Sequence, residues 1–143
     1  MNNLLPIHFA PLQGYTDAAY RQAHARIFGG IDTYYSPFVR VEHGEIRRKD
    51  ARDIHPENNR NIHLIPQLIA SCPNKLEQIM SLLTEHNYQE ADINLGCPFP
   101  MLAKRHNGAG MLPYPEEVKD LLTAAIEQYP QIRFSVKLRL GWK

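Results

Sequence analysis

Short apolar runs alternate with segments of helical or irregular character along this chain, and no other feature limits its possible folds as strongly. The apolar runs predict strands at residues 7–10, 31–36, 62–70, 91–95 and 133–140. A connecting segment long enough for a crossover lies between each pair of neighbours. Strands joined in this way run parallel, with right-handed crossovers. The sequence therefore predicts an α/β fold.

Three of the four connecting segments carry clear helical signals. In the first, Thr16 and Asp17 offer capping groups to a helix that carries on one face Tyr20, Ala23, Ile27 and Phe28. Prolines start the other two helices. Apolar residues at helical spacing follow them: Leu76, Ile79, Met80 and Leu83 after Pro73, and Val118, Leu121, Leu122, Ala125 and Tyr129 after Pro115. In residues 40–60 the helical signal is weak, so we expect at most a short helix there.

A doubly wound sheet and a β/α barrel both fit this order of elements. No G-x-G-x-x-G follows the first strand, and the distinctive polar residues instead follow several strands, as they do in barrel active sites. We therefore predict a TIM-type (β/α)8 barrel. A whole barrel takes about 250 residues. The 143 residues would supply about the first five strands and four crossovers, as one domain over residues 1–143.

Composition indicates in which compartment the chain works and which kinds of partner it can bind. The hydrophobic content of 43% and the lack of about 18 consecutive apolar residues predict a soluble protein without a membrane partner. With 16 basic and 15 acidic residues, charge neither proves nor excludes RNA binding. Cys72 and Cys97 lie in different motifs, and no signal peptide is apparent, so we expect a cytoplasmic protein without a disulfide. The histidines show no metal-ligand spacing, so we expect no metal site.

Four motifs at the predicted strand ends suggest a family. They are APLQGYTD (residues 10–17), PQLIAS (66–71), ADINLGCP (91–98) and VKLRLGW (136–142). Together with RHNGAGMLPYPEEV (105–118), they resemble the tRNA-dihydrouridine synthases, flavoenzymes that reduce uridine in transfer RNA. The resemblance matches the amino-terminal half of the family's barrel. It implies that the second half of the barrel, with its phosphate-binding loops, and the helical RNA-binding domain are absent here.

Cys97 is the candidate catalytic residue. A cysteine thiol has an ordinary pKa of about 8.5, so near neutral pH it is mostly protonated and can protonate a developing carbanion. The resemblance implies that hydride passes from reduced FMN to carbon 6 of uracil and that Cys97 protonates carbon 5. The alternative is a buried cysteine that only packs. After the G-C-P, Phe99, Pro100 and Met101 depart from the small or basic residues of many family members, which leaves the subfamily open.

Two further residues are candidates for substrate binding. The amide of Asn94 can both donate to and accept from a pyrimidine edge, and the resemblance implies this role. The alternative is that Asn94 only closes the turn at the end of its strand. Arg139 follows Lys137 on the same strand face and is a plausible neighbour in the pocket.

The candidate cofactor-binding residues are Pro11, Gln67 and Lys137. An ammonium on an apolar strand needs a polar partner, and the resemblance implies that Lys137 contacts the flavin ring, although a salt bridge within the barrel is an alternative. Gln67 would pair with the pyrimidine part of FMN or lie at the rim. The turn at Pro11 and Gly14 would pass close to the flavin, or Gly14 would simply permit the turn. The implied reductant is NADPH.

Two alternatives to a tRNA-reducing enzyme remain. An FMN-dependent barrel could reduce a small molecule, as dihydroorotate-type oxidoreductases do, or the chain could be a noncatalytic half-barrel. Unpaired backbone groups at the outer strands predict self-association or completion by a missing carboxyl-terminal half. The 143-residue chain alone is then expected to bind FMN poorly and to be inactive.

Overall fold

The computed structural model describes residues 5–142 and confirms the α/β class. The parallel strands are β1 (His8–Phe9), β2 (Thr33–Tyr35), β5 (Leu64–Ile65), β6 (Gln67–Leu68), β7 (Glu90–Leu95) and β8 (Arg133–Leu138). An antiparallel hairpin is formed by β3 (Val41–Glu42) and β4 (Glu45–Ile46). The α-helices are α1 (Ala18–Ile27), α2 (Arg48–Asp53), α3 (Pro73–Glu85), α4 (Pro100–Ala103) and α5 (Pro115–Gln128), and the 3-10 helices are η1 (Pro56–Asn59) and η2 (Gly108–Met111).

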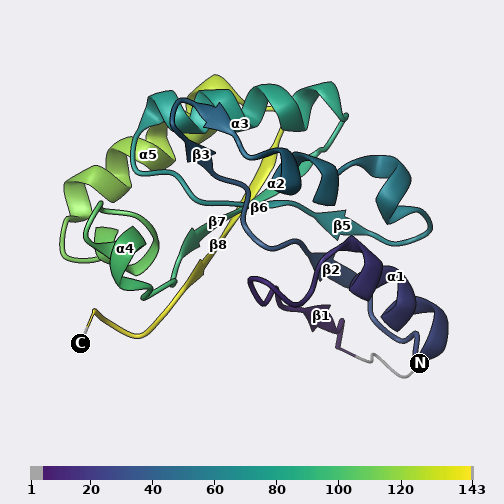
Figure 1. Cartoon of the computed structure of the whole chain (residues 1–143). Coiled ribbons are helices and arrows are strands. Elements are labelled where there is room, and N and C mark those ends of the chain that lie inside the picture. The colour runs from purple at the N-terminus through teal and green to yellow at the C-terminus, as the bar shows by residue number, and fades with distance from the viewer. Residues whose placement is uncertain (1–4, 143) are drawn as a thin grey trace.

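The strands form two parallel sheets, in the orders β1-β2-β5 and β6-β7-β8, which meet at Pro66. The third predicted strand, residues 62–70, is therefore broken in its middle. Proline has no backbone N–H to donate, but the Pro66 carbonyl still accepts from the Asp92 backbone N at 3.0 Å. Together the two sheets form an array of parallel strands that is unclosed within residues 5–142, with β1 and β8 at its two outer edges (Figure 1).

Helices α3 and α5 cover one face of the β6-β7-β8 sheet (Figure 1). The predicted apolar face of α3 is confirmed, because Leu76, Ile79, Met80 and Leu83 are all fully buried. On α5, Leu121 and Ala125 are buried, and Val118, Leu122 and Tyr129 pack partly buried against the same core. The carboxyl ends of β6, β7 and β8 are thus held in place by a well-packed layer of helices.

The apolar face predicted for α1 is exposed. Tyr20, Ala23, Ile27 and Phe28 all contact solvent, and the buried residue of α1 is Arg21. The helix begins where predicted, because the side chain of Asp17 caps it by accepting from the Tyr20 backbone N at 3.0 Å. The reason for the exposure is that α1 lies against the outer strand β1, where no further layer of described residues covers it (Figure 1).

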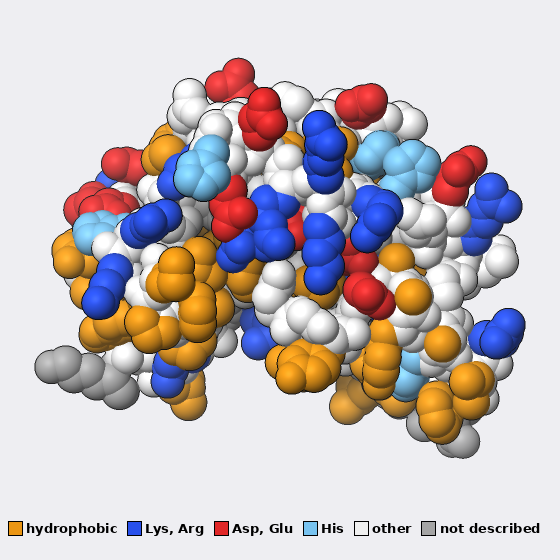
Figure 2. Space-filling model, in the orientation of Figure 1, with side chains coloured by type: hydrophobic (Ala, Val, Ile, Leu, Met, Phe, Trp, Pro, Cys, Tyr) orange, Lys and Arg blue, Asp and Glu red, His pale blue; other side chains and the backbone are white. Residues whose placement is uncertain are grey.

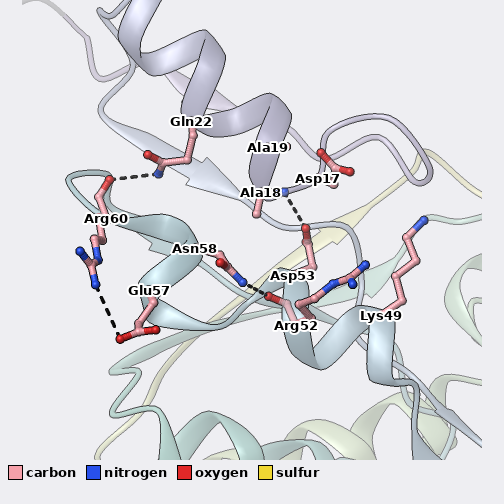
Figure 3. A pocket seen from close by; sticks show the side chains of 10 residues that line it. All are labelled: Asp17, Ala18, Ala19, Gln22, Lys49, Arg52, Asp53, Glu57, Asn58 and Arg60. Atoms are coloured by element: carbon pink, nitrogen blue, oxygen red, sulfur yellow. Dashed lines mark hydrogen bonds and ion pairs between the residues drawn. The ribbon is translucent and has the colours of Figure 1, made fainter.

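Arg21 ties the first part of the chain together. Its Nη1 donates to the Thr16 carbonyl at 2.8 Å, and its Nη2 donates to the Asp53 carbonyl at 2.9 Å. Its Nε and Nη2 both donate to Asn59 Oδ1, and its Nη1 also lies 3.1 Å from Asp53 Oδ2. Asp53 Oδ1 in turn accepts from the backbone N of Ala18, the first residue of α1 (Figure 3). One buried guanidinium therefore fixes α1 against α2 and η1.

Residues 40–60 contain the short helix that we expected and a hairpin that we did not. The loop between β3 and β4 is His43-Gly44, and both residues have positive φ, at 52° and 83°. A two-residue loop with two positive φ angles matches the twist of a hairpin. No helix among residues 5–142 is long and apolar enough to cross a membrane.

Candidate functional site

A cavity of about 240 Å³ lies at the carboxyl ends of the strands and brings together five of the six predicted site residues. Those lining it are Pro11, Gln67, Asn94, Cys97 and Lys137. They come from four separate segments: the turn after β1, the strands β6 and β7 with the loop after β7, and β8. Carboxyl ends of parallel strands meet at one edge of a sheet, so the topology itself produces this convergence.

The amides of Asn94 and Gln67 form a buried polar chain behind Cys97. Asn94 Oδ1 accepts from the backbone N of Gly96 at 3.1 Å and of Cys97 at 2.9 Å. Asn94 Nδ2 donates to Gln67 Oε1 at 2.8 Å, and Gln67 Nε2 donates to Asp92 Oδ2 at 2.7 Å. Asn94 therefore closes the turn that carries Cys97, and each amide keeps one N–H for another partner.

Sequence reasoning missed Asp92 and Ser135, which complete this chain. The hydroxyl of Ser135 donates to Asp92 Oδ1 at 2.7 Å, and Asp92 is almost fully buried. The spacing of Asp92 in the sequence could have indicated this role. Asp92 precedes Asn94 by two residues, and alternate residues of a strand point to the same face. Burial, and next the charge of Asp92, raise the pKa of Tyr35.

The loop from η2 holds Cys97 from the other side. The Ala109 backbone N donates to the Cys97 carbonyl at 3.0 Å. Gly108 is buried with φ of 57°, and a Cβ there would lie 2.8 Å from the Cys97 carbonyl oxygen and 3.0 Å from its Cβ. Glycine is required here for both its φ and its lack of a side chain. The thiol-bearing turn is thus clamped between Asn94 and η2.

Gly108→Ala is expected to destabilise the chain more than Gly30→Ala does. Gly30 also has a positive φ, at 73°, but a Cβ there would meet nothing within 4 Å. The control therefore measures the cost of the backbone conformation alone, about 1–2 kcal/mol. Overpacking against Cys97 should add about 1–3 kcal/mol at Gly108. Urea unfolding of both variants measures the difference, and equal losses would mean that η2 does not pack tightly on Cys97.

Lys137 and Arg139 are both exposed among residues 5–142. Lys137 pairs in register with Asn94, but β8 is an outer strand and its residues 135–138 are exposed. Lys137 nevertheless lines the cavity, so its predicted role in cofactor binding stays a prediction. The predicted strand ends at Leu138 rather than at residue 140, so Arg139 lies beyond it and does not line the cavity.

Two other cavities help to define the site. One of about 260 Å³ is lined by Pro11 and Lys137 together with Tyr35, Asp92 and Ser135, so it adjoins the cavity at Cys97. A larger one of about 540 Å³ lies between α1, α2 and η1, and the polar groups around it are largely paired with one another (Figure 3). The residues that line this larger cavity do not include Cys97 or its neighbours, so it belongs to the scaffold rather than to the site.

Comparison with solved structures found a shared fold. The chain resembles the active domain 2 of a chitinase from Pyrococcus furiosus with a TM-score of 0.53 at 14% sequence identity. The likeness covers 93% of this chain and 47% of the chitinase chain. At this identity only the fold is shared.

Comparison with curated proteins identifies the family. The chain is 26% identical to tRNA-dihydrouridine synthase B of Klebsiella pneumoniae over 134 residues, and 30% identical to tRNA-dihydrouridine(16) synthase of Neisseria meningitidis over 144 residues. These alignments cover 94% and 96% of this chain but 41% and 43% of the relatives. The family model described as "Dihydrouridine synthase (Dus)" matches residues 8–143. The chain therefore belongs to the dihydrouridine synthase family, whose fold is a TIM barrel.

Proposed function

We propose that this chain forms part of an FMN-dependent enzyme that uses NADPH to reduce uridine in transfer RNA to 5,6-dihydrouridine. The observation that carries the proposal is the cavity in which Cys97 meets Pro11, Gln67, Asn94 and Lys137. Membership of the family, whose relatives are named as tRNA-dihydrouridine synthases, supports the substrate class.

The residues around the cavity fit a flavin ring. Pro11 and Lys137 line both of the adjoining cavities, so a flat ring could extend across them. Lys137 forms no ion pair within residues 5–142, which leaves its ammonium available to a ring that gains negative charge on reduction. Gln67 retains one amide N–H for the ring edge. Bound FMN would supply the hydride.

Cys97 is then the proton donor. Reduction of uracil adds a hydride at carbon 6 and a proton at carbon 5, so the acid must lie beside the ring in the same cavity. The half-buried Cys97 thiol gives its proton to carbon 5, and the resulting thiolate regains one from solvent. The bonds from Asn94 and η2 keep the thiol at a fixed position during this transfer.

The substrate class can be tested by NADPH consumption. The full-length protein that carries this chain is incubated with FMN, NADPH and either unmodified transfer RNA or a small pyrimidine such as orotate. We expect transfer RNA to stimulate the oxidation of NADPH and the small pyrimidine to leave it unchanged. Stimulation by the small pyrimidine alone would make the protein a small-molecule oxidoreductase.

Lys137→Met in the full-length protein is expected to weaken FMN binding about ten- to hundredfold, because a hydrogen bond to a charged group contributes roughly 1.5–3 kcal/mol. Stability should change less than the FMN affinity, because removing a charge together with its need for a partner can be nearly neutral for folding. Flavin fluorescence titration measures the affinity, and Lys49→Met, an exposed lysine of α2, is the matched control. Equal FMN affinity in the two variants would remove Lys137 from the cofactor site.

A further inference from the structure

A further cavity, which we call the second cavity, lies on the other side of the turn that carries Cys97. It measures about 470 Å³ and is lined by Pro98, Lys104, His106, Tyr114 and Trp142 among others. Pro98 also lines the cavity at Cys97, so the two cavities share a wall. None of the predicted catalytic or cofactor-binding residues lines this second cavity.

Its walls are flat, aromatic and accessible. The ring of His106 stacks on that of Tyr114 with 4.1 Å between centroids and 15° between planes. The Nδ1 of His106 lies 2.8 Å from Glu117 Oε2, which fixes the stacked pair against α5. Tyr114 and Trp142 nevertheless remain 44% and 42% exposed. The cavity thus offers aromatic surface that residues 5–142 leave partly uncovered, and its His106–Tyr114 pair is held in place.

Positive charge lies beside this aromatic surface. Lys104 and Arg105 are exposed at the end of α4, and neither forms an ion pair within residues 5–142. Figure 2 shows hydrophobic side chains gathered over the α4 end of the molecule, with Lys and Arg side chains among them. Flat aromatic rings flanked by cations suit an unstacked nucleobase and its phosphate.

We propose that this second cavity binds, by stacking, the base that neighbours the reduced uridine in single-stranded RNA. The proposal rests on the proposed function and adds a specificity surface to it. Consecutive bases lie along one backbone, so a uridine in the cavity at Cys97 places its neighbour across the shared wall at Pro98. Tyr114 and Trp142 supply the stacking surface, and Lys104 contacts the phosphate between the two nucleotides.

The chain contains its own reporter for this test. Trp142 is the single tryptophan, so its fluorescence comes from this cavity alone. We expect a short single-stranded RNA that contains uridine to quench the emission in a saturable way, whereas inorganic polyphosphate of equal charge should not. Tyr114→Leu should weaken binding by about tenfold, as expected for loss of one stacking partner. Lys104→Gln should reduce the salt dependence of binding, and the distant Lys49→Gln should leave it unchanged.

Two controls keep the result interpretable. Circular dichroism checks that each variant is folded, and anisotropy of labelled RNA measures binding to a Trp142→Leu variant, which is expected to be weaker than to the unaltered chain. RNA binding without quenching, equal quenching by polyphosphate, or unchanged RNA affinity of folded Tyr114→Leu would overturn the proposal. Uridine reduction is judged separately on the full-length protein, so a protein that reduces uridine but does not stack RNA here would refute this inference alone.

Discussion

Cys97→Ala in the full-length protein is expected to lower the rate of uridine reduction by about a hundred- to ten-thousandfold, the usual cost of losing a general acid. Flavin binding and its reduction by NADPH should persist, because the thiol is not among the predicted cofactor-binding residues. The measurement is a single-turnover reaction of the reduced protein with unmodified transfer RNA, followed by stopped-flow absorbance of the flavin.

Cys72→Ala is the matched control for this prediction. Cys72 is the other free cysteine, also half-buried, but it lies at the start of α3 and does not line the cavity. Its loss should therefore leave the rate unchanged. A Cys97→Ala protein that turns over as fast as the Cys72→Ala protein would show that another group protonates carbon 5.

Arg21→Met is expected to lower the free energy of unfolding by about 3–5 kcal/mol, as removal of one partner of a buried ion pair does. The substitution keeps much of the side-chain volume but removes every bond to Asp53, Asn59 and Thr16. The carboxylate of Asp53 would be left partly buried, with the backbone N–H of Ala18 as its remaining partner among residues 5–142. Urea or thermal unfolding measures the loss.

The matched control for Arg21 is Arg60→Met. Arg60 pairs with Glu57 at 3.6 Å, and both side chains are more than 70% exposed, so its loss should cost at most about 1 kcal/mol. Similar losses for the two arginines would show that Arg21 does not hold α1 against α2 and η1. Loss of Arg21 should also affect the cavity at Cys97. Arg21 donates to the Thr16 carbonyl, and the Thr16 hydroxyl accepts at 2.8 Å from the backbone N of Leu12, which lines that cavity.

The approximate positions of the parallel strands and the buried faces of α3 and α5 could be predicted from the sequence because both depend on local periodicity. The break at Pro66 could not, since its effect depends on which neighbours the strand pairs with. The exposed face of α1 was missed for a related reason. Periodicity locates an apolar stripe, but it does not say whether another layer covers it.

The candidate site was more predictable than its supporting bonds. Strand-end residues converge by topology, and this brought Cys97 and Lys137 to one cavity. The link from Gln67 to Asp92 depends on the register between β6 and β7, which pairs these two residues directly. The fit of Gly108 against Cys97 depends on the path of a loop. Neither the register nor the loop path is specified by local pattern, so these contacts emerged only in the structure.

The most direct test of a uridine-reducing site is the product itself. The full-length protein is incubated with FMN, NADPH and transfer RNA that lacks dihydrouridine, and the RNA is digested and analysed by mass spectrometry. We expect a nucleoside heavier than uridine by two hydrogen atoms, formed in proportion to the NADPH consumed and absent with Cys97→Ala. Consumption of NADPH without this nucleoside, or its formation at the normal rate by Cys97→Ala, would contradict the assignment of the cavity at Cys97 as the site of reduction.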